Sequence, residues 1–294
     1  MLVAFRIVVA CAHSIFWAIV GPLATQIVPR GHQPFALSMV ATGTSIAMIL
    51  GLPLGRLIGL ALGWRMTFLF LSFVSLLDMA YLWRIFPVLT QGAPFTLHDL
   101  PGLLRNPIVM GVSFLALLYA GSYFTVYSYI EPFLETVAHF SAQGITWTLV
   151  FLGVCGIGGS AVFSRFYEAR RQPVFYFELG ALLAVMVLFL PAASFRPTML
   201  LCCMVFGMIF TMFGTTMQAE LIRGCPQAAA PVAMAIYSGI FNVGIASGTW
   251  LGGHLVSRDL LSYIGFAGAV LAVGATLVAL CFYVPKIKAG SGQP

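Results

Sequence analysis

Long apolar segments recur along almost the whole chain, and they constrain its fold more than any other feature. Each is about 20 residues long, the length of helix that crosses the hydrocarbon core of a bilayer. They lie near residues 2–28, 36–61, 66–86, 107–130, 145–164, 174–191, 197–219, 231–256 and 261–284. The pattern therefore predicts an all-α fold, a polytopic membrane helix bundle of about nine transmembrane helices.

Composition supports a membrane protein and excludes several other classes. Of the 294 residues, 61% are hydrophobic and 7% are charged, whereas an ordinary soluble domain carries about 25% charged residues. The net charge of +6 does not indicate nucleic-acid binding, because the basic residues are scattered singly along the chain. The six cysteines lack metal-ligand spacing, and hydrolase, zinc-protease and P-loop motifs are absent, so we predict no metal site, no catalytic residues and no enzyme.

The basic residues also predict an orientation, since loops rich in Lys and Arg stay cytoplasmic. A cytoplasmic C-terminus places nine basic residues inside and five on or toward the other side. The nine are Arg30, Arg84, Arg105, Arg165, Arg170, Arg171, Arg223, Lys286 and Lys288. Residues 87–106, which are rich in Pro, Gly and polar side chains, are predicted to form a central cytoplasmic loop.

A weak internal repeat suggests how the segments are grouped. Shifting the sequence by 197 positions lays Pro29 on Pro226, Pro34 on Pro231 and Gly51 on Gly248. Residues 2–86 then repeat residues 199–283. Some transporters consist of two six-helix halves related by an axis along the membrane normal. We therefore expect 1–86 to be the last three helices of an N-terminal bundle and 107–294 to be a six-helix C-terminal bundle.

Two ladders of glycine are the sharpest local motifs, and their members stand four residues apart. Residues at this spacing share a helix face, so each ladder predicts a groove that lets a neighbouring backbone approach closely. Such a groove serves ordinary tight packing or a sliding seam between helices, and both interpretations stay open. The ladders are Gly51, Gly55, Gly59 and Gly63, with Pro53 among them, and Gly244, Gly248 and Gly252.

Polar residues inside apolar segments are candidate functional residues, because burying them in hydrocarbon is costly. Arg6, His13 and Trp17 follow helical spacing in the first segment and form one stripe. His13 is either a packing residue or a titratable cavity residue. Asp78, in the middle of the third segment, needs a partner when ionised and can carry a proton when neutral.

The fourth and eighth segments supply the candidates for substrate binding. Tyr123, Tyr127 and Glu131 recur every four residues, and aromatic rings that carry hydroxyl groups suit a sugar. An interfacial aromatic belt is the alternative for these residues. Asn242 is the best candidate in the eighth segment, whereas Glu220, near the end of the seventh, is interpreted as interfacial.

Four stretches together resemble a known family: AHSIFW (12–17), GLPLGR (51–56), YSYIEPF (127–133) and SGIFNVGIASGTWLGG (238–253). They are similar to the drug:H⁺ antiporter-1 type of the major facilitator superfamily, and most closely to SotB-like bacterial sugar efflux transporters. The resemblance begins at that family's fourth helix, which implies an N-terminally truncated form. The basic segment SRFYEARRQ (164–172) resembles a degenerate copy of the superfamily's cytoplasmic signature loop, and a plain topology anchor is the alternative.

The resemblance implies proton-coupled efflux of sugars or sugar-like solutes across the bacterial inner membrane, driven by the proton gradient without a cofactor. Expected partners are the lipid bilayer and a small-molecule substrate, with no nucleic acid; the oligomeric state stays open. Expected substrate contacts are His13, Trp17, Tyr123, Tyr127 and Asn242, and expected proton-coupling residues are Arg6, Asp78 and Glu131. The alternatives are multidrug efflux and a truncated remnant that transports nothing.

Overall fold

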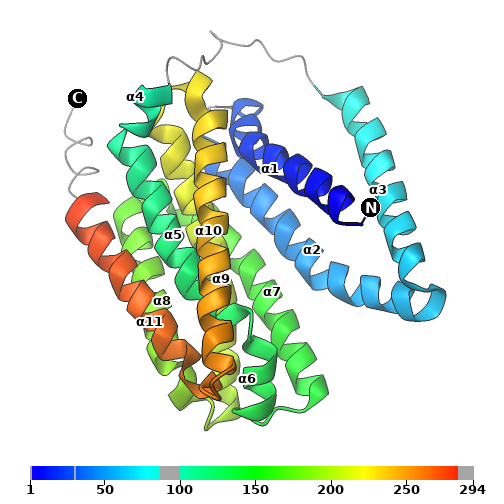
Figure 1. The fold of residues 1–294 in the computed structure, drawn as a ribbon. Helices are drawn as coiled ribbons and strands as arrows, with labels where there is room; N and C mark the ends of the chain where they lie inside the picture. The colour runs from blue at the N-terminus through cyan, green and yellow to red at the C-terminus, as the bar shows by residue number, and fades with distance from the viewer. Residues whose placement is uncertain (1, 30, 87–99, 284–294) are drawn as a thin grey trace.

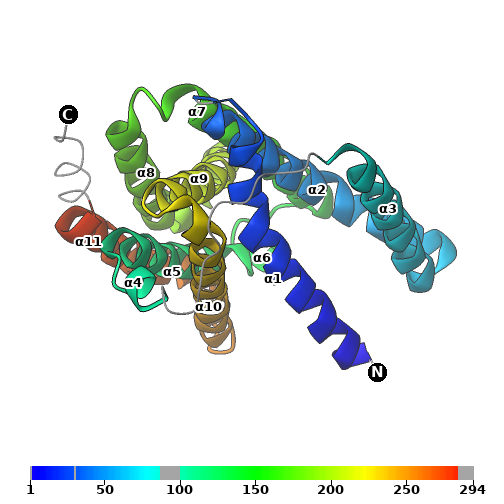
Figure 2. The same cartoon turned by 90° about the horizontal axis from the view of Figure 1, so that it is seen from above.

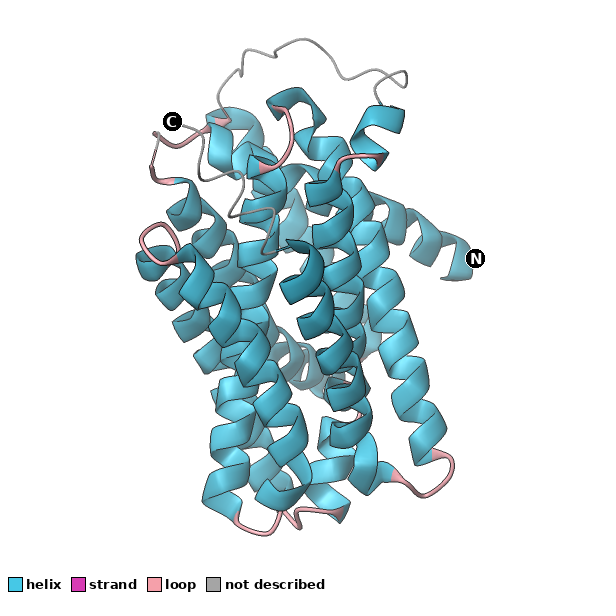
Figure 3. Ribbon diagram, turned by 90° about the vertical axis from the view of Figure 1, so that its left-hand side faces the viewer, coloured by secondary structure: helices cyan, strands magenta, loops and turns pink. Residues whose placement is uncertain are grey.

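The computed structural model describes residues 2–29, 31–86 and 100–283, and every regular element in these ranges is a helix (Figure 3). The long helices are α1 (Leu2–Gln26), α2 (Gln33–Leu62), α3 (Trp64–Ile85), α5 (Pro107–Tyr127), α7 (Ala142–Phe166), α8 (Arg171–Ala192), α9 (Arg196–Arg223), α10 (Ala230–Val256) and α11 (Ile264–Val278). The short ones are α4 (Leu100–Leu104), α6 (Ile130–Thr136), the 3₁₀ turns η2 (Gln227–Ala229) and η3 (Leu261–Tyr263), and the π-helical turn η4 (Ala279–Tyr283).

The prediction of an all-α membrane bundle is confirmed. Eight segments of the described residues are long and apolar enough to cross a membrane, and α1 covers the first predicted segment with a helix of 25 residues. Most of the predicted loop at 87–106 falls outside the described residues, and α4 lies within its last part.

Six of the long helices pack into one bundle around α5 (Figures 1 and 2). Helix α5 contacts α9, α10 and α11, while α8 closes the bundle against α9 and α11. Their facing side chains form one continuous hydrophobic core. The two views show that α3 and the N-terminal part of α1 extend away from this bundle.

The first three helices join the bundle through α1 and α2. Helix α1 packs against α10, and α2 packs against α7 and α9, whereas α3 has no buried residue and contacts α2. We call the contacts of α1 and α2 with α7, α9 and α10 the seam.

The helix boundaries support the internal repeat. After the shift of 197 positions, Gln26 falls on Arg223, Gln33 on Ala230 and Trp64 on Leu261. The first pair of residues ends α1 and α9, the second pair begins α2 and α10, and the third pair begins α3 and η3. Residues 2–86 and 199–283 therefore share these three helix boundaries, although α2 and α10 have 30 and 27 residues and α3 and α11 have 22 and 15.

The second glycine ladder packs directly on the backbone of α5. A Cβ atom added to Gly244, Gly248 or Gly252 would lie 2.5, 2.2 or 2.6 Å from the carbonyl oxygens of Leu117, Gly121 and Thr125, respectively. The three carbonyls are also four residues apart, so the two helices match turn by turn. Helices α7 and α9 meet in the same way, because a Cβ on Gly159 or Gly207 would lie 2.3 or 2.1 Å from a carbonyl oxygen of the other helix.

The first ladder does not form a close-packed groove among the described residues, which differs from the prediction. A Cβ on Gly55 or Gly59 would meet only Thr67 of α3, at 3.7 and 3.6 Å, and one on Gly51 would meet nothing within 4 Å. Gly63 is not on the helix face at all: it ends α2 with a φ of 87°, a backbone conformation that favours glycine. Pro53 lies in α2, and its side chain is outside the described part.

Candidate functional site

A small cavity is lined by residues of α2, α5, α7 and α9, and we call it the seam cavity. Its volume is about 30 Å³. Hydroxyl groups, aromatic rings and glycines share its wall. The lining residues are Ser45, Tyr123, Phe124, Tyr127, Leu152, Gly153, Gly156, Gly207, Phe210 and Thr211. Two of the predicted substrate contacts, Tyr123 and Tyr127, are thus in one cavity wall.

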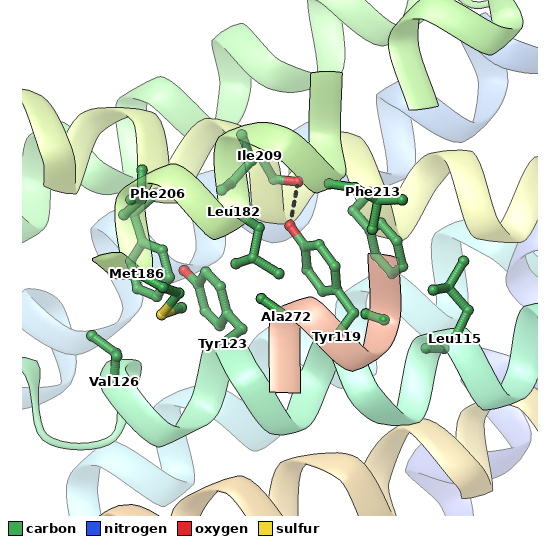
Figure 4. Close-up of a cluster of buried hydrophobic side chains, with 14 of the residues drawn as sticks. Leu115, Tyr119, Tyr123, Val126, Leu182, Met186, Phe206, Ile209, Phe213 and Ala272 are labelled. Atoms are coloured by element: carbon green, nitrogen blue, oxygen red, sulfur yellow. Dashed lines mark hydrogen bonds between the residues drawn. The ribbon is translucent and has the colours of Figure 1, made fainter. Parts of the chain in front are cut away.

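The two tyrosines contribute to this wall differently. Their ring centroids are 5.4 Å apart, and Tyr127 is only partly buried. Tyr123 is 1% exposed and stacks on Phe206 and Phe210, with centroid distances of 3.9 and 4.2 Å. One turn earlier, the hydroxyl of Tyr119 donates to the carbonyl oxygen of Ile209 at 3.0 Å (Figure 4). The aromatic row of α5 therefore runs from the protein core to the cavity.

Hydroxyl groups join α2 to the bundle beside the cavity. The side-chain oxygens of Thr42 and Ser160 are 2.6 Å apart and share a hydrogen bond. A Cβ on Gly156 would lie 3.0 Å from the hydroxyl oxygen of Ser45 and 2.9 Å from that of Thr211. Glycine at this position therefore leaves room for two hydroxyl groups that come from opposite sides of the seam.

The stripe on α1 lies away from the seam cavity. Trp17 Nε1 donates to His13 Nε2 at 2.8 Å, so these two predicted substrate contacts are paired on the helix surface. His13 is exposed. The side chain of Arg6 falls outside the described part of the chain.

The other predicted residues are also separate from the cavity. Asn242 is exposed on α10 and donates to the carbonyl oxygen of Ser238 at 2.8 Å. Asp78 is exposed on α3. Glu131 does not continue the Tyr123–Tyr127 stripe, because α5 ends at Tyr127 and Glu131 lies in the first turn of α6. The following Pro132 explains the break, since proline has no N–H to continue the helix.

An open groove of about 640 Å³ lies at the C-terminal end of α10. Trp250 and His254 line it, with ring centroids 5.7 Å apart and nearly parallel planes. Tyr129 lies on the other side and donates to the carbonyl oxygen of Thr249. The groove is a shallow polar and aromatic surface rather than an enclosed binding site.

A charged cluster joins the α7–α8 turn to the end of α9. Glu220 is 2% exposed and accepts a hydrogen bond from Tyr167 Oη at 2.7 Å. It also forms a bidentate ion pair with Arg171, whose Nε and Nη2 donate to the two carboxylate oxygens. Arg223 pairs with Glu168 and lies 5.2 Å from the centre of the Tyr167 ring. Burial, followed by the negative charge of Glu220, raises the pKa of the Tyr167 hydroxyl well above its usual value. Arg171 and Tyr167 thus cover the Glu220 carboxylate near the end of α9, and its interfacial position stays a prediction.

Glu178 is a functional candidate that the sequence reasoning missed. It lies on α8 and is 0% exposed. Thr216 Oγ1 of α9 donates to its Oε1 at 2.6 Å, whereas its Oε2 is buried without a hydrogen-bond partner in the part of the chain described. A signal existed in the sequence, since Glu178 is an acidic residue in the apolar segment 174–191.

The family model of the Major Facilitator Superfamily matches residues 1–238. This chain belongs to the major facilitator superfamily. The match covers α1 to α9 and the first turns of α10, so it includes both sides of the seam. The chain is thus a multi-pass membrane transporter of this superfamily, and its apolar helices lie in a lipid bilayer.

Proposed function

We propose that this chain takes part in proton-coupled export of sugars or sugar-like small solutes across the bacterial inner membrane. The seam cavity carries the proposal. Tyr127 offers a ring and a hydroxyl group, and Ser45 and Thr211 add hydroxyl groups from α2 and α9. A sugar has apolar ring faces and a rim of hydroxyl groups, so aromatic rings and short alcohols complement it.

The volume of the cavity implies a closed conformation. A space of about 30 Å³ holds about one water molecule, whereas small-molecule sites usually measure roughly 300–1,000 Å³. We infer that the site enlarges when α2 moves away from α7 and α9. That movement separates Thr42 from Ser160 and withdraws Ile49 from the surface of Gly153. In alternating access, movements of this kind open the site first to one side of the membrane and then to the other.

The proposed membrane orientation and the proposed coupling to protons rest on features outside the seam cavity. We propose a cytoplasmic C-terminus and a cytoplasmic α7–α8 turn, because Arg165, Arg170, Arg171 and Arg223 gather at that end of the bundle. Coupling to protons is supported by the resemblance to proton-driven exporters and by His13 and Asp78 within predicted spans.

Substrate binding provides the direct test. The purified protein is titrated with a panel of sugars and of amphipathic dyes, with intrinsic tryptophan fluorescence and radioligand retention as readouts. We expect Tyr127→Ala to weaken sugar binding by about 1–2 kcal/mol, because it removes both the stacking ring and the hydroxyl group. Tyr127→Phe keeps the ring and loses only the hydroxyl contribution. Tyr176→Ala is the matched control, since Tyr176 is exposed on the outer face of α8.

The outcomes separate the candidate substrates. Binding of sugars that Tyr127→Ala weakens and Tyr176→Ala leaves unchanged supports the proposal. Binding of dyes alone favours multidrug export, for which Phe124, Leu152 and Phe210 provide an apolar wall. Sugar binding that is unaffected by Tyr127→Ala would place the substrate site elsewhere.

A further inference from the structure

Glu178 lies in a setting that does not suit a permanently ionised carboxylate. Its side chain is fully buried, and it forms no ion pair in the part of the chain that the structure describes. One oxygen, Oε1, accepts a hydrogen bond from Thr216, whereas the other, Oε2, has no hydrogen-bond partner among the described residues. Burying an unpaired charge costs several kcal/mol, and a carboxyl group avoids most of this cost by binding a proton.

Arg171 and Glu220 are charged groups on the same two helices as Glu178 and its partner Thr216. Arg171 lies seven residues earlier on α8, about 10 Å along the helix axis, and Glu220 lies one turn beyond Thr216 on α9. Arg171 binds Glu220, and Tyr167 donates to the same carboxylate. The Arg171–Glu220 ion pair thus lies about two helical turns from Glu178 along α8.

The other helices around Glu178 bring no further cation to it among the described residues. Helix α5 contributes Tyr119, whose hydroxyl donates to Ile209, and α10 contributes Tyr237 next to Tyr119. Helix α11 carries no ionisable side chain between Ile264 and Val278. Beyond Tyr167, Arg223 is bound to Glu168. Arg171 is therefore the cation placed to neutralise an ionised Glu178.

We propose that Glu178 is a proton-binding site and that its proton is linked to the Arg171–Glu220 ion pair. In the conformation described, Glu178 holds a proton and Arg171 neutralises Glu220. When Arg171 turns from Glu220 to Glu178, Glu178 releases its proton, and Glu220 takes up one proton as it loses its cation. The number of protons and the net charge of the three groups stay constant in this exchange. The proton thereby moves from the interior of the bundle to its charged end.

This inference rests on the proposed proton coupling for its role in transport, but the proton site itself can be tested without any substrate. The assay is infrared spectroscopy of the purified protein in detergent at neutral pH, which detects the C=O stretch of protonated carboxyl groups and its shift in D₂O. We expect a band in the wild type that Glu178→Gln abolishes. Glu135→Gln is the matched control, because Glu135 is exposed on α6, and it leaves the band unchanged.

Two variants that keep Glu178 test the link to Arg171. In Glu220→Gln, Arg171 loses the carboxylate of Glu220, and we expect it to turn to Glu178, so that the band is lost although Glu178 is present. In Arg171→Gln, both acids lack their cation, so we expect a second protonated band from Glu220. Size-exclusion profiles confirm that each variant is folded.

A band that survives Glu178→Gln, or one that Glu220→Gln leaves unchanged, would overturn the inference. If sugar binding is absent while the band follows the expected pattern in all four variants, the proton site stands and the proposed substrate is wrong. If sugar binding follows Tyr127 while the band ignores Glu178, the proposed substrate stands and the proton site is wrong.

Discussion

Replacing Gly248 with alanine tests whether the α5–α10 contact depends on glycine. The added Cβ would lie 2.2 Å from the carbonyl oxygen of Gly121, 2.9 Å from its carbonyl carbon and 3.0 Å from its Cα atom. Carbon and carbonyl oxygen normally approach to about 3.3–3.6 Å. All three neighbouring atoms are backbone, so they cannot rotate away. The two helices must separate locally by about 1 Å.

Two opposed effects determine how much Gly248→Ala changes the free energy of unfolding. Overpacking of this kind typically costs about 1–3 kcal/mol. Alanine in place of glycine gains up to about 1 kcal/mol in helix propensity. Separation of the helices also loosens the adjacent contacts of Gly244 and Gly252 with Leu117 and Thr125. We therefore expect Gly248→Ala to lower the free energy of unfolding by about 1–3 kcal/mol relative to a glycine-to-alanine change without a clash.

Gly239→Ala is that matched control, because Gly239 lies on the same helix and an added Cβ would meet nothing within 4 Å. The assay is thermal unfolding of both variants in detergent, followed by fluorescence-detected size exclusion. We expect Gly239→Ala to unfold at or above the wild-type temperature and Gly248→Ala several degrees below it. Equal unfolding temperatures for the two variants would refute the reasoning, since the carbonyl contact would then have no energetic consequence.

Two further predictions concern the ends of the helices. Burial raises the pKa of the Cys225 thiol to about 11. Because the thiolate is the reactive form, we expect the rate of maleimide labelling to rise about tenfold per pH unit up to that value. The measurement uses a variant in which Cys225 is the one cysteine kept. Labelling that levels off near pH 9, as for an ordinary thiol, would contradict this. For orientation, we expect Ala169→Cys in the α7–α8 turn to react only with permeant reagents in intact cells, and Ser257→Cys beyond α10 to react from outside; the reverse pattern would invert the proposed topology.

Helix number and order could be predicted from the sequence because the bilayer sets a minimum length for each apolar segment. The repeat also indicated where helices end, because Pro29 and Pro226 mark equivalent turns between helices. The break between Tyr127 and Glu131 could also have been predicted from Pro132, which a count based on four-residue spacing ignores. Spacing describes one continuous helix, and a proline directly after a candidate residue can end that helix before it.

The two glycine ladders show why packing is harder to predict than helices. Both have the same spacing, but only Gly244, Gly248 and Gly252 face a row of carbonyl groups on a neighbouring helix. The glycine spacing shows that one face of a helix lacks side chains. Tertiary structure decides which neighbouring helix packs against that face. The Arg171–Glu220 ion pair could not be predicted for the same reason, because its two residues are 49 positions apart and on different helices.

The distribution of close contacts indicates where this transporter can move. Within the bundle, α5 and α10 meet through three glycine–carbonyl contacts, and α7 meets α9 through Gly159 and Gly207. Sliding either pair along its axis would drive side chains into backbone atoms, so each pair moves as a unit. At the seam, α2 meets α7 through the Thr42–Ser160 hydrogen bond, the flexible side chain of Ile49 and the buried apolar contact of Leu37 with Phe163. A hydrogen bond of this kind contributes only about 0.5–1.5 kcal/mol, and a rotamer change relieves the Ile49 contact. Opening at the seam would therefore break side-chain contacts but, among the described residues, no glycine–carbonyl contact, and it would enlarge the cavity beside Tyr127, the proposed substrate site.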